Sequence, residues 1–340
     1  MKNFILTSCL IASILISAIL VFSANGKKTI SQIYSNIKKE QTASVLSVIP
    51  QEKQGFSLLF VGDVMLDRGV KNSIETKFEG DYIKLFDLIE QRMAKSDISI
   101  LNLEGPVSDK GYDMQHLYSF RMDTDVLRVL RNAGFNYISF TNNHVGDWGH
   151  EAFDDTLVRA EKEDFKIIGA GKNYAEIIEP VIWQKDNIKI GFLGFSDVGP
   201  NYMKAGTTTS GILLLSDPNL KNIINNARTK VDQLVVSVHW GEEYMTYPNE
   251  RQIEMGKNLI DWGATLVVGH HPHVMQTTAR YRNGLIIYSL GNFIFDQNFS
   301  KETMEGGVLE VTFDKNAIES YKINKIQLDK NFIPSFVEVE

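Results

Sequence analysis

Apolar and polar positions divide the chain into three parts. Residues 4–24 form an uncharged run rich in Ile, Leu, Val and Ala, residues 25–55 are mostly polar, and from Phe56 short apolar runs alternate with amphipathic stretches. Such alternation is typical of an α/β layered domain. The pattern predicts an anchor or signal segment (1–24), a linker or stalk (25–55) and one globular domain (56–340).

The short apolar runs predict strands, and the amphipathic stretches predict helices. We expect strands at residues 57–61, 98–101, 137–140, 188–192, 234–238, 265–268, 285–289, 308–313 and 321–328. We expect helices at residues 82–94, 125–133, 151–163, 218–228 and 250–262. Asp123 or Thr124 would cap the second helix, and Asn249 the last.

Two turns predict hairpins between neighbouring strands. Residues 185–187 would join a strand at 181–184 to the strand at 188–192, and Asn283-Gly284 is a two-residue hairpin signal. Hairpins among strands that alternate with helices favour a mixed sheet, or two stacked sheets, over a purely parallel one.

The N-terminal apolar run is long enough to cross a bilayer as one helix, since about 20 apolar residues suffice. Lys2 precedes it, and Lys27 and Lys28 follow it. A secretory signal peptide is the alternative, because small residues near 21–23 could permit cleavage. We favour an uncleaved single-pass anchor in the cell membrane with an extracytoplasmic domain; the alternative is a secreted protein.

Composition excludes several classes of function. The net charge is -7 and Lys and Arg are scattered, so no nucleic-acid partner is expected. The single cysteine, Cys9, lies in the apolar run, so the chain forms no internal disulfide and has no cysteine-rich zinc site.

Six polar motifs follow apolar runs, where successive strands would bring them to one edge of a sheet. They contain carboxylates, an amide and five of the seven histidines. The expected metal ligands are Asp63, Glu104, Asn143, His239, His271 and His273. The expected acid-base pair is His144 and Asp147.

Each motif alone has an ordinary structural explanation, and only the set indicates a site. Asp63 follows Gly62, which permits close backbone approach, and Glu104 shares one face of an extended segment with Asn102. Asp147 could orient His144, which could act as an acid or a phosphate donor. A lone Asp, Glu or Asn-His pair would more often cap a turn or face solvent.

The remaining polar residues near these motifs receive supporting or ordinary roles. His270 is expected to be structural or to support a ligand. His116 and His150 are read as surface or loop histidines. Glu242 and Glu243 could orient His239 or form a solvated acidic loop, which is the favoured reading of Glu243.

Together these residues could hold two divalent ions bridged by a carboxylate, with Mn, Zn or Fe as candidates. Two such ions activate a water and stabilise attacking and leaving oxygens. The sequence contains neither a glycine-rich phosphate loop nor a Gly-x-Ser-x-Gly elbow.

The ordered motifs GDVM, NLEGPVSD, TNNHVGDWG, VHWGEEY, GHHPH and SLGNFIFD, over about residues 57–297, resemble the CapA/PgsA-type capsule-synthesis family. The resemblance implies the fold of calcineurin-like metallophosphoesterases, a four-layer sandwich of two mixed β-sheets flanked by helices. It also implies a part in making or exporting poly-γ-glutamate from a membrane-anchored position, with the anionic polymer or its precursor and capsule synthase subunits as partners.

The chain departs from this superfamily at two positions. The histidine expected two residues after the first aspartate is Met65, whose thioether is a poor ligand for hard ions, and Val145 stands where an acid usually follows Asn-His. Three hypotheses follow: a CapA-like protein supporting capsule synthesis, a free-standing metal-dependent phosphoesterase, and a scaffold of a membrane synthase with a vestigial site.

Overall fold

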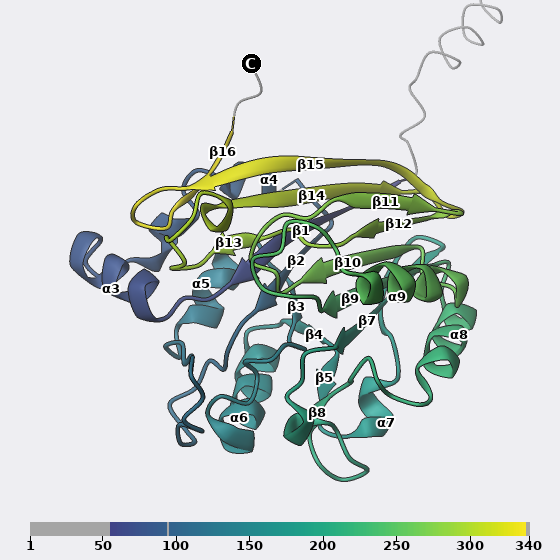
Figure 1. Ribbon diagram of the computed structural model, residues 1–340, viewed down its shortest axis with the longest axis horizontal. Helices are drawn as coiled ribbons and strands as arrows, with labels where there is room; N and C mark the ends of the chain where they lie inside the picture. Colours follow the sequence, from purple (N-terminus) through teal and green to yellow (C-terminus); the bar gives the residue numbers. More distant parts are fainter. Residues whose placement is uncertain (1–54, 94, 338–340) are drawn as a thin grey trace, which may run out of the picture. The chain divides into compact units, whose positions relative to one another are not determined.

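In the computed structural model, which describes residues 55–93 and 95–337, two large β-sheets pack against each other and helices cover their outer faces (Figure 1). The predicted segment 1–24 and nearly all of the linker lie outside these residues. Within the described ranges, no helix is long and apolar enough to cross a membrane.

The first sheet has eight strands and is mixed. Strands β1 to β4 run parallel, and β14, β15 and β16 extend the sheet from β1 with antiparallel pairing, while β13 pairs parallel with the end of β1. The strands are β1 (Phe56–Val64), β2 (Ile98–Leu103), β3 (Tyr137–Ser139), β4 (Lys166–Ile168), β13 (Asn292–Ile294), β14 (Glu305–Phe313), β15 (Ile318–Leu328) and β16 (Pro334–Phe336).

The second sheet has six strands, in the order β11-β12-β10-β9-β7-β6, and is also mixed. A small sheet of two strands, β5 and β8, lies beside the larger ones. The strands are β5 (Ala170–Gly171), β6 (Val181–Lys185), β7 (Ile188–Ser196), β8 (Gly211–Ile212), β9 (Gln233–His239), β10 (Leu266–His270), β11 (Thr278–Tyr281) and β12 (Gly284–Ile287).

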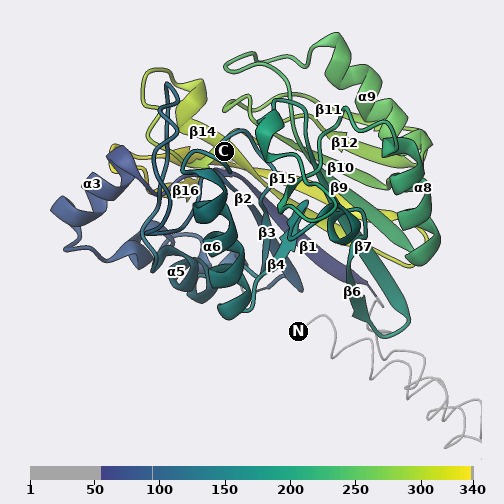
Figure 2. The same ribbon diagram turned by 90° about the horizontal axis from the view of Figure 1, so that it is seen from below.

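Helices flank the paired sheets on opposite sides (Figure 2), with α3, α5 and α6 on one side and α8 and α9 on the other. The helices are α3 (Arg68–Lys77), α4 (Glu90–Met93), α5 (Val126–Asn132), α6 (Gly149–Lys162), α7 (Tyr174–Ile177), α8 (Leu220–Lys230) and α9 (Glu250–Asp261). The described residues also form three short 3-10 helices, η1 (Tyr82–Leu85), η2 (Asn201–Met203) and η3 (Glu302–Met304).

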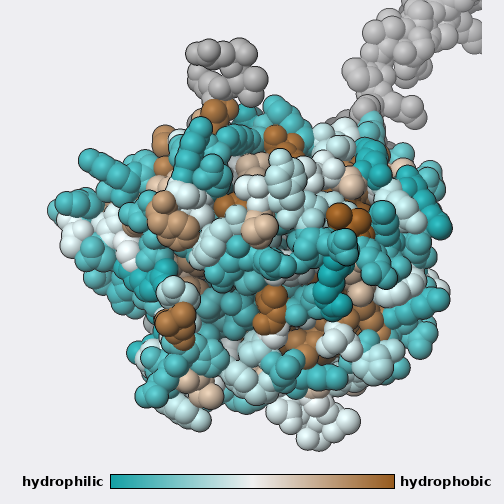
Figure 3. Space-filling model, in the orientation of Figure 1, coloured by the Kyte–Doolittle hydropathy of each residue, from teal (hydrophilic) through white to brown (hydrophobic). Residues whose placement is uncertain are grey.

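Strand periodicity explains the layering. In β1, Leu58 and Phe60 are buried between the two sheets, whereas Leu59 and Val61 are buried under the helices of the first sheet. In β9, Val235 enters the core between the sheets, and its neighbours pack under α8 and α9. The outer surface in Figure 3 is mainly hydrophilic, with hydrophobic residues in small groups.

The expected mixed α/β class, the nine strands and both hairpins are confirmed, with the pairing of β6 with β7 and of β11 with β12. The Asn249 cap is confirmed as a capping box with Gln252. The turn before β12 is displaced by one residue, because Gly284 pairs with Tyr281 inside the hairpin. A Cβ at Gly284 would lie 2.5 Å from Ile260 Cδ1, so any side chain there would force Ile260 of α9 to shift.

Two predictions about helices are wrong. Residues 82–94 form η1, turns and the short α4 instead of one helix, because hydrogen bonds from Phe86, Ile89 and Arg92 to the residues three before them tighten this stretch. Helix α5 begins after Asp125, and Asp123 does not cap it through its side chain. That carboxylate instead accepts hydrogen bonds from Lys71 Nζ at 2.7 Å and Tyr82 Oη at 3.3 Å.

The long loop after β2 is fixed to α6 by one buried carboxylate, Asp155. It accepts hydrogen bonds from Ser108 Oγ and Arg159 Nε, each at 2.6 Å, and pairs with Lys110 Nζ at 2.8 Å. Burial alone would raise the pKa of Asp155, but these three partners lower it to about 2. This loop leads towards the site described next.

Candidate metal centre

The register of three parallel strands places the first site residues side by side. Asp63, near the end of β1, lies opposite Asn102 of β2 on one side and opposite Asn292 of β13 on the other. Gly62 makes this possible, because a Cβ there would lie 2.0 Å from Gly291 O. The close backbone approach expected at Gly62 is therefore present.

The second sheet adds histidines from the ends of two neighbouring parallel strands. His239 of β9 lies opposite His270 of β10. The loop after β10 then carries His271 and His273, both with left-handed backbone, at φ 99 and 57. Such conformations in bulky residues cost about 1–3 kcal/mol and occur often at functional sites.

Asp63 is fully buried and hydrogen-bonded on both carboxylate oxygens. Oδ1 accepts from Asn102 Nδ2 at 2.9 Å and from His270 Nδ1 at 3.1 Å, and Oδ2 accepts from the His271 backbone N–H at 3.3 Å. Burial would raise its pKa, but hydrogen bonds from His270 and His273 hold it well below the ordinary value. Asp63 is thus an anion in the folded protein.

Glu104 is also fully buried, close to Asp63. Its Oε1 accepts from Asn102 Nδ2 at 3.0 Å, which fits the shared face predicted for Asn102 and Glu104, and Asn102 thereby bridges the two carboxylates. Burial and the charge of Asp63 raise the pKa of Glu104 well above its ordinary value. Glu104 Oε2 is buried and has no hydrogen-bond partner among the described residues.

His239 is oriented by two asparagines. Its Nε2 donates to Asn143 Oδ1 at 2.7 Å, while its Nδ1 lies 3.4 Å from Asn102 Nδ2. Burial, and then the nearby imidazole of His271, hold the pKa of His239 well below the ordinary value, so the ring is neutral. A neutral imidazole is the form that binds metal.

The two closing histidines differ in their partners. His273 Nδ1 donates to Asn292 Oδ1 at 3.0 Å and lies 3.4 Å from Asp63 Oδ2. Burial would lower the pKa of His273, but the charges of Glu104 and Asp63 outweigh it and raise this pKa to about 9. Burial and the neighbouring charge of His273 lower the pKa of His271 to about 3. His271 Nδ1 is buried without a hydrogen-bond partner in the described chain.

His144 and Asp147 form a pair beside the metal-type ligands. His144 Nδ1 and Asp147 Oδ2 are 2.8 Å apart, and Oδ2 also accepts the Phe120 N–H at 2.9 Å. The Phe120 ring lies against the imidazole, with centroids 4.1 Å apart. The side-chain amide oxygen of Asn142 accepts the His144 backbone N–H at 3.1 Å, so both ring and backbone of His144 are held.

Met65 takes no part in this cluster. It is fully buried with Phe120 and Phe295, and its Sδ accepts the Asp67 backbone N–H at 3.1 Å. At the position where the superfamily has a histidine, this chain therefore has a methionine that packs against two phenylalanine rings.

The structure brings the eight predicted site residues into one neighbourhood, and the donor set suits divalent cations. Two groups have ligand atoms within 4.8 Å of one another: Asp63, Glu104 and His239, and Glu243, His271 and His273. The buried, unpartnered Glu104 Oε2 and His271 Nδ1 are the atoms expected of ligands. The residues therefore fit the metal centre that the resemblance implies.

Two residues of the neighbourhood are not among the ligands that the sequence predicts. Asn292 lies in one of the six motifs, but only the pairing of β13 with β1 reveals that it holds His273. Glu243 stood beside His239 in the sequence, and its default reading was a solvated loop residue. His270 does support Asp63, as one of its expected roles states.

Comparison with known proteins identifies the family of the chain. The family model described as bacterial capsule synthesis protein PGA_cap matches residues 57–297. The PGA biosynthesis protein CapA of Bacillus subtilis is 32% identical over 275 residues, covering 80% of this chain and 71% of the relative. The capsule biosynthesis protein CapA of Bacillus anthracis is 32% identical over 272 residues, covering 77% of this chain and 65% of the relative.

A solved structure supports the fold alone. A proposed 5'-nucleotidase of Staphylococcus aureus, in complex with alpha-ketoglutarate, is similar over 79% of this chain and 54% of that chain, with a TM-score of 0.50 and 15% sequence identity. With the match of the family model over most of the described chain, and relatives one-third identical, the protein belongs to the bacterial capsule synthesis protein family PGA_cap.

Proposed function

We propose that this protein is an accessory protein of poly-γ-glutamate capsule synthesis or export that depends on a divalent-metal site of metallophosphoesterase type. One observation carries the proposal. Buried carboxylates and imidazoles from the strand ends of two sheets converge, and Glu104 Oε2 and His271 Nδ1 among them have no hydrogen-bond partner in the described residues. Burial of polar atoms without partners costs free energy unless a cation satisfies them.

Asp63, Glu104, Asn143, His239 and the two closing histidines would hold two ions, with Mn, Zn or Fe as candidates. When bound, such ions supply an activated water and stabilise charge on oxygen. The protein's own contribution is orientation: Asn102 spaces the two carboxylates, and Asn292 holds His273.

His144 supplies proton transfer in this proposal. Its Nδ1 is bound by Asp147 Oδ2, which leaves Nε2 as the atom that exchanges a proton with a bound substrate. A phosphoester or amide bond of the polymer or of its precursor would be the target.

The place of action is part of the proposal. The apolar residues 4–24, with Lys2 before them and Lys27 and Lys28 after them, favour a single-pass anchor in the cell membrane. The site would then lie outside the cytoplasm, near the synthase subunits and the anionic polymer. A cleaved signal peptide and a secreted protein are the alternative.

Complementation tests this function. Cells that carry the other subunits of a poly-γ-glutamate synthase but lack this protein would receive the wild type or Asp63→Asn, and polymer at the cell surface would be measured. We expect the wild type to restore polymer and Asp63→Asn to fail at an equal protein level. No restoration by the wild type would refute the role, and full restoration by Asp63→Asn would refute the dependence on metal.

A free-standing phosphoesterase is the second candidate, and the preserved His144–Asp147 pair favours it over a vestigial scaffold. Turnover of generic phosphomonoesters and phosphodiesters with added Mn²⁺ or Zn²⁺ separates the candidates. Turnover that is lost in His144→Ala, without any effect of the protein on polymer in cells, would favour the phosphoesterase.

A further inference from the structure

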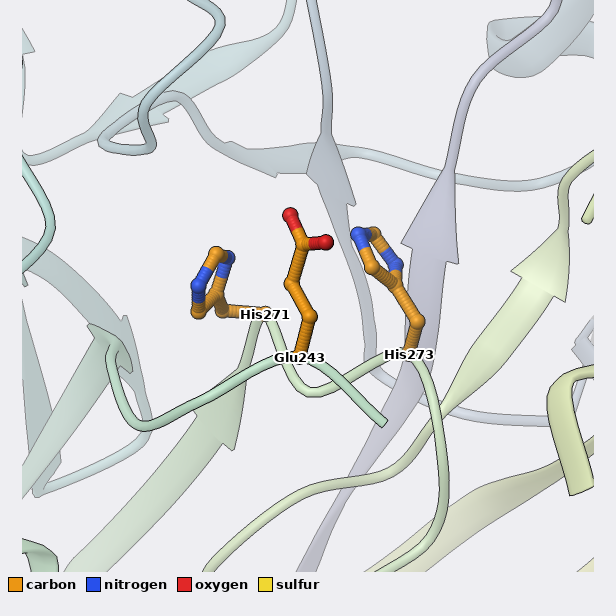
Figure 4. Close-up of side chains that lie close together, drawn as sticks. All are labelled: Glu243, His271 and His273. Carbon is orange, nitrogen blue, oxygen red and sulfur yellow. The ribbon is translucent and has the colours of Figure 1, made fainter. Parts of the chain in front are cut away.

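The loop after β9 brings a carboxylate to the two closing histidines. Glu243 lies four residues after His239, and its ligand atom is within 4.8 Å of those of His271 and His273. Figure 4 shows the three side chains extending in the same direction, with Glu243 between the two imidazoles. A carboxylate and two imidazoles are a recurrent ligand set for Zn²⁺ and Fe²⁺.

His271 has an unused ligand atom in this group. The residue is 7% exposed, and Nδ1 is buried with no hydrogen-bond partner in the described part of the chain. Its backbone N–H is fixed to Asp63 Oδ2, so the ring cannot easily leave the site. A buried imidazole nitrogen without a partner costs free energy unless a ligand satisfies it.

The ring of His273 is also oriented so that one nitrogen can bind a cation. Asn292 Oδ1 accepts from Nδ1, which leaves Nε2 as the nitrogen available to a cation. Nε2 lies 4.0 Å from Glu104 Oε2, so this group adjoins the one formed by Asp63, Glu104 and His239. Two adjacent cation positions follow from this arrangement.

The Glu243 carboxylate lies in the group with the imidazoles of His271 and His273. Its neighbour Glu242 is held elsewhere, since Glu242 Oε1 accepts from Asn249 Nδ2 at 3.2 Å. Both adjacent glutamates carry a carboxylate, but only that of Glu243 lies with the two closing histidines.

Met65 supplies no ligand atom to this group. The thioether is packed with Phe120 and Phe295 and accepts the Asp67 N–H. We propose that Glu243 is a metal ligand which, with His271 and His273, completes a second cation position beside Asp63, Glu104 and His239. The proposal rests on the metal centre of the proposed function, and it adds a ligand that the sequence favoured as a solvated loop residue.

Mn²⁺ binding to the full-length, chelator-treated protein tests the proposal. Equilibrium dialysis gives the stoichiometry and affinity, and electron paramagnetic resonance distinguishes coupled pairs of Mn²⁺ from single ions. Glu243→Gln keeps the shape of the side chain and removes the anionic ligand, and Glu242→Gln is the matched control. Glu243→Asp, which retracts the carboxylate by one methylene, provides a second variant should the first fail to fold.

We expect the wild type and Glu242→Gln to bind two ions and give the spectrum of a coupled pair. Glu243→Gln is expected to keep one ion, weaken the second by about 100-fold and give the spectrum of a single ion, and Glu243→Asp to weaken the second by about tenfold. Wild-type binding of two ions in both Glu243 variants would overturn the role of Glu243 alone. Absence of bound Mn²⁺ in the wild type would overturn the metal centre itself.

Discussion

Replacing Gly62 by alanine is expected to separate β1 from β13 and to damage the metal centre with the fold. The new Cβ would lie 2.0 Å from Gly291 O and 2.9 Å from Gly291 C, both backbone atoms that cannot rotate away. Gly291 O also accepts the hydrogen bond from Asp63 N at 2.9 Å. The next residues of the two strands, Asp63 in β1 and Asn292 in β13, lie opposite each other.

The size of the effect follows from the overlap. Carbon and carbonyl oxygen approach to about 3.3 Å in proteins, so the strands must move apart by about 1.3 Å. Overpacking of this kind costs about 1–3 kcal/mol, and loss of the Asp63 N–Gly291 O hydrogen bond adds about 1 kcal/mol. We expect the free energy of unfolding to fall by about 2–4 kcal/mol.

Urea denaturation of the full-length protein, followed by circular dichroism, measures this change, and Mn²⁺ affinity is measured on the same samples. Gly206→Ala is the control, because the nearest atom to its Cβ is Thr209 Oγ1 at 3.4 Å, an ordinary contact. Gly62→Ala with a stability within about 0.5 kcal/mol of the wild type and unchanged Mn²⁺ affinity would refute the close approach of the strands.

Three further substitutions have defined outcomes. Asp155→Asn should lower the free energy of unfolding by about 1–2 kcal/mol at pH 7. The folded pKa of Asp155 is about 2, so the stabilisation by its carboxylate is complete above pH 4 and is lost as the pH falls from 4 towards 2. Equal differences in urea midpoint between the two proteins at pH 7 and at pH 2.5 would contradict this prediction. Asn292→Ala should weaken Mn²⁺ binding by about 10–100-fold, since His273 Nδ1 loses its acceptor; unchanged binding in equilibrium dialysis would count against that role. Met65→His should destabilise the fold by about 1–3 kcal/mol, because a polar ring would enter an apolar contact; a thermal midpoint equal to that of the wild type would show that the pocket is less apolar.

The parts of the fold that the sequence predicts are those set by local pattern. Strands β1 and β9 are buried on both faces, which their continuous apolar runs indicate directly, and the two capping residues of α9 are only three positions apart in the sequence. Asp63 and His239 could be found because each directly ends an apolar run. Such features need no knowledge of which strands pair.

The parts that the sequence does not predict depend on contacts between distant segments. Asn292 meets Asp63 only because β13 pairs with β1, across more than two hundred residues of chain. The favoured reading of Glu243 as a solvated residue follows from its exposed loop, and only the fold brings it to His271. The helix expected at residues 82–94 failed because its apolar spacing also fits tighter turns.

Metal content tests the central claim most directly. Full-length wild type and Asp63→Asn would be loaded with Mn²⁺, freed of unbound ion by gel filtration and analysed by mass spectrometry of the metal. The account predicts about two ions per wild-type chain and a clear loss in Asp63→Asn, with circular dichroism unchanged. No ion retained by the wild type, or equal metal content in both proteins, would contradict it.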